Sequence, residues 1–132
     1  MTVNVLIITH NNVGKALLSA AINTLGFCPL TAEVLSIQDD CDPDKTILQA
    51  KKTIETLDQG EGVLILTDIF GSTPSNIACA LSNEENVQII SGINLPMLIR
   101  VLNYPNLELE ELVVKAVSGG KEGIMNCNSQ VD

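Results

Sequence analysis

Apolar and polar positions fall in alternating blocks along the chain, which indicates strands separated by helices. Short apolar runs without helical spacing predict strands at residues 3–9, 30–37, 62–67 and 87–91. The first and third runs, VNVLIIT and GVLILT, are almost wholly apolar and rich in branched residues, which is typical of parallel strands buried on both faces. A fifth run, at residues 123–127, predicts a short and weak last strand.

Between these runs, apolar residues recur at helical spacing and follow helix start signals. Helices are expected at residues 13–25, from 43 to Gly60, from 73 through Leu81, and at 94–102 and 108–118. The expected N-caps are Asn12, Asp42, Thr73 and Asn94, and proline follows closely after the last three. Gly119-Gly120 is expected to break the last helix.

Strands that alternate with helices through short connections predict one doubly wound α/β domain over residues 1–132. Right-handed crossovers place the carboxyl ends of parallel strands on one edge of the sheet. His10, Asp68 and Gly92 follow three of these strands and should meet there. Ligands bind beyond this edge in open α/β sheets, so it is the expected site.

Composition excludes several classes of function. The net charge of −9 argues against nucleic acid, because binding to its phosphates needs clustered lysine and arginine. No apolar run approaches the ~20 residues of a membrane helix, and no basic segment marks the N-terminus as a signal peptide.

The four cysteines form no CxxC pair and accompany a single histidine, which argues against zinc. We expect no metal and no cofactor. Free thiols favour a reducing cytoplasm. Cys79 lies in an apolar helical run and is expected to be a small core residue.

The expected edge combines an imidazole, a carboxylate and donors to an anion. Asp68 is the candidate to bind one ring N–H of His10, which fixes the tautomer and supports positive charge on the ring. The turn Gly71-Ser72-Thr73 adds hydroxyls and backbone N–H groups, and helix starts favour anions. This set suits a histidine that accepts a phosphoryl group.

Simpler interpretations of each residue remain open at this point. His10 fits a hydrogen-bonding residue at a strand end, Asp68 a loop carboxylate, and Thr73-Pro74 an ordinary helix start. Other phosphate chemistries fit less well. Asn12–Lys15 does not supply the GxxxxGK[ST] of a P-loop, and Thr9-His10-Asn11 lacks the acidic metal ligands of a receiver domain.

Four segments carry a family resemblance: THNNVGKALLSAA, LTDIFGSTPSNIA, SGINLPMLIRVL and AVSGGKEGI. Together they resemble the mannose-type IIA component of the phosphoenolpyruvate-dependent sugar phosphotransferase system. The resemblance runs from about Val3 to about Cys127, with the segments in the family's order.

The resemblance implies a cytoplasmic phosphocarrier. His10 would take a phosphoryl group from the histidine-containing phosphocarrier protein and pass it to a IIB component, with Asp68 as the partner of the ring. Thr73 falls on a hydroxyl position near the phosphoryl group, and Gly71 and Ser72 lie in the same turn. No IIB domain follows before Asp132, so IIB is expected on a separate chain.

The family fold implied here has four parallel strands and one antiparallel strand, the segment 123–127, which is exchanged within a homodimer. Asn11 and Ser72 stand where the family usually or often has glycine. Two related functions also fit: the phosphoryl donor domain of a dihydroxyacetone kinase system, and a regulatory module read out by its phosphorylation state.

Overall fold

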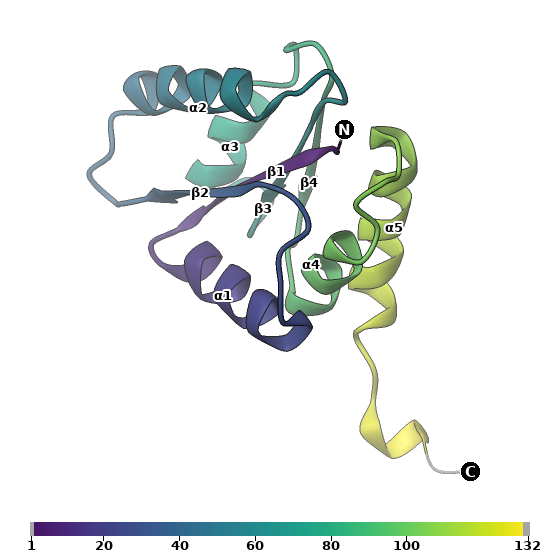
Figure 1. The fold of residues 1–132 in the computed structure, drawn as a ribbon. Coiled ribbons are helices and arrows are strands. Elements are labelled where there is room, and N and C mark those ends of the chain that lie inside the picture. Colours follow the sequence, from purple (N-terminus) through teal and green to yellow (C-terminus); the bar gives the residue numbers. More distant parts are fainter. Residues whose placement is uncertain (1, 131–132) are drawn as a thin grey trace.

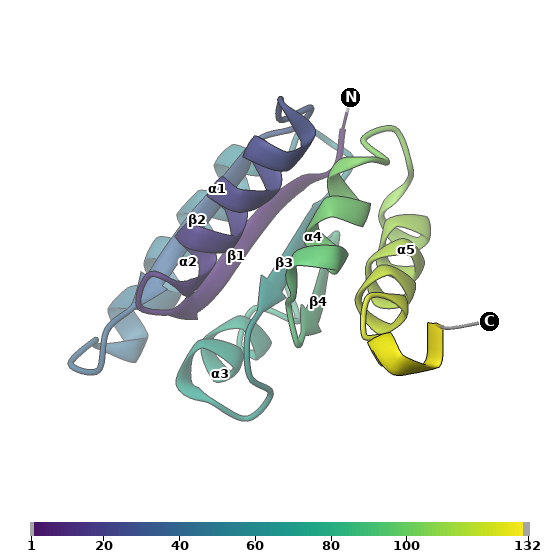
Figure 2. The same ribbon diagram turned by 90° about the horizontal axis from the view of Figure 1, so that it is seen from below.

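The computed structural model describes residues 2–130 as a parallel sheet between two layers of helices (Figures 1 and 2). The strands are β1 (Asn4–His10), β2 (Ala32–Ile37), β3 (Val63–Thr67) and β4 (Val87–Ser91). The helices are α1 (Val13–Leu25), α2 (Pro43–Leu57), α3 (Thr73–Cys79), α4 (Leu95–Leu102) and α5 (Leu109–Glu122). A short 3-10 helix, Cys127–Gln130, follows. No helix among the described residues is long and apolar enough to cross a lipid bilayer.

The sheet has the order β2-β1-β3-β4, and all of its strand pairs are parallel. The first and third strands are therefore neighbours, which brings the ends of β1 and β3 together. The N–H of Gly92 donates to the carbonyl of Asp68 at 2.9 Å and ties the end of β4 to the same edge. The predicted meeting of three strand ends is confirmed.

Each face of the sheet covers its own core, which explains the unbroken apolar runs. Helices α1, α4 and α5 cover one face, and α2 and α3 cover the other (Figure 2). In β1, Val5 and Ile7 pack into the first core while Leu6 and Ile8 pack into the second. A strand buried on both faces needs apolar residues at successive positions.

The start of α1 is held by β1 rather than by its own cap residue. Oγ1 of the buried Thr9 accepts a hydrogen bond from the N–H of Gly14 at 2.7 Å. Asn12 occupies the N-cap position, but its side chain makes no capping bond. A β-carbon on Gly14 would lie 2.8 Å from Cγ2 of Ile7, so this glycine lets the helix approach the strand closely.

Two of the other expected helix starts are confirmed and one is shifted. Asp42 accepts from two backbone N–H groups of α2, and Asn94 accepts from the N–H of Met97 at 2.8 Å. The N-cap of α3 lies one residue earlier than expected: it is Ser72, and Thr73 is the first helical residue. Cys79, at the end of this short helix, is exposed, so its assignment to the core was wrong.

The prediction that Gly119-Gly120 breaks the last helix is wrong, because α5 continues to Glu122. Both glycines face α4 at close range. A β-carbon on Gly119 would lie 2.6 Å from Cβ of Arg100, and one on Gly120 would lie 2.9 Å from Cε of Met97. The glycines thus permit close packing of two helices instead of ending one.

The expected fifth strand is absent from the described residues of this single chain, so the sheet has four strands rather than five. Residues 124–126 have no regular structure, and the segment leads away from the body of the molecule (Figure 1). A strand needs a partner for its backbone, and this segment does not return to either edge of the sheet. Its antiparallel pairing within a dimer stays a prediction.

Candidate functional site

His10 and Asp68 come together because their strands are neighbours. His10 is the last residue of β1, and Asp68 is the first residue after β3. Oδ2 of Asp68 accepts from the backbone N–H of His10 at 2.9 Å and lies 2.8 Å from Nδ1 of its ring. The carboxylate side chain is only 12% exposed, whereas the imidazole is 36% exposed and open to a partner.

The charge of Asp68 determines which ring nitrogen carries the proton. Burial raises the pKa of this carboxyl, but hydrogen bonds from His10 and from the N–H of Ile69 outweigh burial and hold the pKa below its ordinary 3.8. An ionised carboxylate only accepts hydrogen bonds, so Nδ1 of His10 carries the proton. In the neutral ring, the lone pair is then on Nε2.

A left-handed residue turns the chain directly after the histidine. Asn11 has φ of 44°, a conformation that asparagine tolerates better than most other residues. Its N–H donates to the carbonyl of Ile37 at 3.0 Å, which joins this turn to the end of β2. Ser72 has φ of −84°, so no glycine is needed at that position.

A small cavity of about 100 Å³ opens beside the imidazole, lined by His10, Ile37, Gln38, Asp39 and Thr73. Pockets for small organic ligands are roughly 300–1,000 Å³. This cavity, at about 100 Å³, is well below that range. It suits a group the size of a phosphoryl rather than a sugar.

The comparisons with known proteins decide the family. Residues 4–117 match the family model of mannose-type EIIA proteins, described as "PTS system fructose IIA component". The chain belongs to this family. The members of this family are IIA components of the phosphotransferase system (PTS).

Curated relatives of this IIA component agree. The mannose-specific EIIAB component of Escherichia coli K12 is 30% identical over 127 residues, which cover 94% of this chain and 39% of the relative. The fructose-specific EIIA component of Bacillus subtilis is 26% identical over 83 residues, which cover 61% of this chain and 57% of the relative. The chain thus spans about two fifths of the length of the E. coli relative.

Solved structures share the fold of this IIA component. An EIIA component from Streptococcus agalactiae has a TM-score of 0.84 at 22% identity, covering 96% of this chain and 98% of that one. A mannose/sorbose-specific IIA subunit from Enterococcus faecalis has a TM-score of 0.83 at 19% identity, covering 100% and 96%.

Only three of the five predicted site residues of this IIA component line the cavity or hydrogen-bond to a residue that lines it. His10, Asp68 and Thr73 gather at the cavity or beside it. Gly71 and Ser72 lie in the same turn as Thr73, but their polar groups are engaged inside the turn. The Ser72 hydroxyl donates to the carbonyl of Ile69 at 2.5 Å, and the N–H of Gly71 donates to Oγ of Ser75 at 3.4 Å.

Sequence reasoning missed Gln38 and Asp39, which line the cavity. They follow the carboxyl end of β2, so the rule that pointed to His10 and Asp68 would also have pointed to them. Phe70, in the turn after β3, is 79% exposed. Its neighbour Ile69 is 63% exposed, so the turn beside Asp68 presents two apolar side chains to solvent.

Proposed function

We propose that this chain is a phosphocarrier in which Nε2 of His10 accepts a phosphoryl group from the histidine-containing phosphocarrier protein. The group then passes to a IIB component on a separate chain. The observation that carries the proposal is the contact of 2.8 Å between Nδ1 of His10 and Oδ2 of Asp68. It leaves Nε2 as the nucleophilic atom of an accessible ring.

The transfer needs no proton to move at His10. The Nε2 lone pair forms a bond to the phosphorus of the donor's phosphohistidine. The donor's N–P bond breaks, and its electron pair returns to the donor ring. The imidazole of His10 becomes positively charged while Nδ1 keeps its proton, and the ionised Asp68 stabilises that charge.

The turn after β3 is proposed to hold the oxygens of the transferred group. Thr73 lines the cavity and is the first residue of α3, so its hydroxyl and backbone are candidates to bind those oxygens. Gly71 and Ser72 would contribute backbone donors after a small adjustment of the turn, because the 3.4 Å bond from Gly71 to Ser75 is long. Thr73 is therefore the strongest phosphoryl-binding candidate of the three.

We further propose that the chain forms a homodimer through its C-terminal segment. Ile124 is 77% exposed and borders a hollow of about 170 Å³ beside β4, an edge strand of the sheet. An unpaired edge and an exposed apolar segment favour pairing with another chain. The segment from a second copy would supply the antiparallel strand implied by the family resemblance.

Intact-mass measurement tests the phosphocarrier directly. The chain is incubated with the phosphocarrier protein, its upstream enzyme and phosphoenolpyruvate. We expect one added phosphate on the unmodified chain and none on His10→Ala. Asn12→Ala is the matched control, because Asn12 is exposed in the same loop and its side chain makes no capping bond.

A phosphate on His10→Ala would overturn the assignment of His10. Adding candidate IIB proteins to the phosphorylated chain gives the second readout. Loss of the phosphate to a IIB protein supports onward transfer. A phosphate that no IIB protein removes contradicts onward transfer and favours a regulatory module.

A further inference from the structure

A second hollow lies next to the His10 cavity, on the face of the sheet that α2 and α3 cover. It has a volume of about 270 Å³, lies between α2 and α3, and is lined by Pro43, Ile47, Thr73, Asn76 and Ile77. We call it the α2–α3 groove. Thr73 also lines the His10 cavity, so the two hollows are neighbours. A molecule seated in the groove would lie against the mouth of the cavity.

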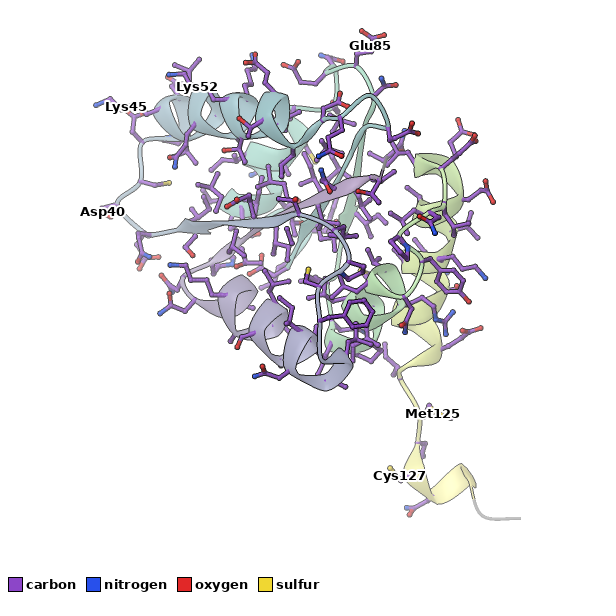
Figure 3. All side chains as sticks on the ribbon, viewed as in Figure 1. Asp40, Lys45, Lys52, Glu85, Met125 and Cys127 are labelled. Atoms are coloured by element: carbon purple, nitrogen blue, oxygen red, sulfur yellow. The ribbon has the colours of Figure 1, made fainter. Side chains whose placement is uncertain are left out.

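The charge around both hollows is negative. Residues 39–44 run from the loop after β2 into the first turn of α2, and four of these six residues are aspartates; we call this segment the acidic loop. Asp39 lines the His10 cavity, and Asp42 and Asp44 flank Pro43 of the groove. Asp40 stands at the outer tip of the loop (Figure 3).

Neither hollow is lined by lysine or arginine among the described residues. A phosphoryl group brings a charge of about −1.5 to −2. On His10 it would lie near Asp39 and the ionised Asp68, and the imidazole alone cannot balance these charges. Cationic side chains on the molecule that delivers the group would supply positive charge that the lining of the two hollows lacks.

We propose that the phosphoryl donor protein docks on the α2–α3 groove and the acidic loop. An apolar side chain of the donor fills the groove, and neighbouring lysine or arginine side chains of the donor face the acidic loop. One of these cations lies next to Asp39 and balances the transferred group. This inference rests on the proposed phosphocarrier function and adds the surface that selects the donor.

A second copy of the chain fits this surface poorly. Each copy carries a net charge of −9, so two acidic loops would repel each other. The exposed C-terminal segment follows α5, which covers the other face of the sheet (Figure 2). A dimer built through that segment leaves the groove open for the donor.

Initial rates of phosphorylation at increasing donor concentration test the groove. Asn76→Trp places a large ring in the groove at an exposed position of α3. Gln49→Trp is the matched control, because Gln49 is an exposed amide on α2 that does not line the groove. We expect KM for the donor to rise about tenfold in Asn76→Trp, with kcat within about twofold and the control unchanged.

A charge reversal tests the acidic loop. Asp40→Lys should raise KM and flatten the dependence of KM on salt. Glu85→Lys is the control, since Glu85 is also exposed and projects from a distant part of the surface (Figure 3).

An unchanged KM in both Asn76→Trp and Asp40→Lys, with the unmodified chain phosphorylated, overturns the docking surface but leaves the phosphocarrier intact. If the unmodified chain takes no phosphate at any donor concentration, both proposals fail. If Asn76→Trp changes the oligomeric state in light scattering and leaves KM unchanged, the groove holds a second copy and the inference is wrong.

Discussion

At the scale of single residues, one oxygen atom organises the site. Oδ2 of Asp68 accepts the backbone N–H of His10 and also lies within hydrogen-bond distance of its ring. The same carboxylate therefore joins the ends of β1 and β3 and fixes the ring tautomer. Its second oxygen, Oδ1, accepts from the N–H of Ile69, which limits rotation of the carboxylate.

Asp68→Asn should slow phosphoryl transfer to His10 while leaving the fold intact. The amide keeps the size of the carboxylate but not its charge, and its NH2 group cannot accept from Nδ1–H. We expect a loss of about a hundredfold, the lower end of what such help contributes. Stopped-flow transfer from the phosphorylated donor measures the rate, with thermal melting as the control. Unchanged transfer in a well-folded variant would make Asp68 an ordinary loop carboxylate.

The lowered pKa of Asp68 also predicts a pH dependence of stability. A carboxyl whose pKa is lower in the folded chain stabilises it above the ordinary value of 3.8, and loses this effect as the pH falls through the folded value. At pH 7 the unmodified chain should have a higher melting temperature than Asp68→Asn. The difference between the two melting temperatures should become smaller below about pH 4. Melting curves of both proteins at pH 7 and below pH 4 check this, and a difference in melting temperature that does not change with pH would contradict it.

At the scale of elements, sequence predicted the starts of helices better than their ends. Asp42-Pro43 and Asn94 are local signals, because their side chains cap backbone groups two or three residues away. Whether Gly119-Gly120 ends a helix or packs inside one depends on α4, which is not adjacent to these glycines in sequence. The two glycines alone therefore suggested a break. The left-handed conformation of Asn11 is consistent with the glycine that the family usually has at that position, whereas the role of Thr9 in holding α1 emerges only from packing.

Gly119→Ala tests the close contact between α4 and α5. Helix propensity alone would stabilise the variant by about 1 kcal/mol. The contact with Cβ of Arg100 should reverse this, with a net destabilisation of about 1–3 kcal/mol, since this β-carbon is held by its own helix backbone. Lys121→Ala, at an exposed position of α5, should shift the free energy of unfolding by less than about 0.5 kcal/mol. Chemical denaturation gives the free energy of unfolding of both variants and of the unmodified chain. A Gly119→Ala variant that is more stable than the unmodified chain would contradict close packing at this position.

At the scale of the whole molecule, the site lies at one edge of the sheet and the exposed C-terminal segment extends away from the body. Figure 3 shows Met125 and Cys127 on that segment, clear of the helices. Sequence reasoning assigned a strand there because its residues suit one. Strand formation depends on pairing with another strand, and within the described residues of a single chain this segment pairs with neither β2 nor β4, the edge strands of the sheet.

Light scattering at micromolar concentration should give twice the chain mass of 14.1 kDa. Truncation after Gly123 removes the segment but keeps all of α5, and should shift the protein toward monomer. Ile124→Ser should weaken the dimer, whereas Val114→Ser, also highly exposed but on α5, should not. A monomer in the unmodified chain, or equal effects of both serine variants, would contradict exchange of the segment.

The most direct measurement of the central claim is the nitrogen on which the phosphoryl group resides. His10 is the only histidine, so nitrogen–proton correlation spectra of the ¹⁵N-labelled, phosphorylated chain show a single imidazole. We expect phosphorus on Nε2 and a proton retained on Nδ1, hydrogen-bonded to Asp68. Phosphorus on Nδ1, or a phosphorylated chain with an unchanged imidazole spectrum, would contradict the assignment of Nε2 as the acceptor.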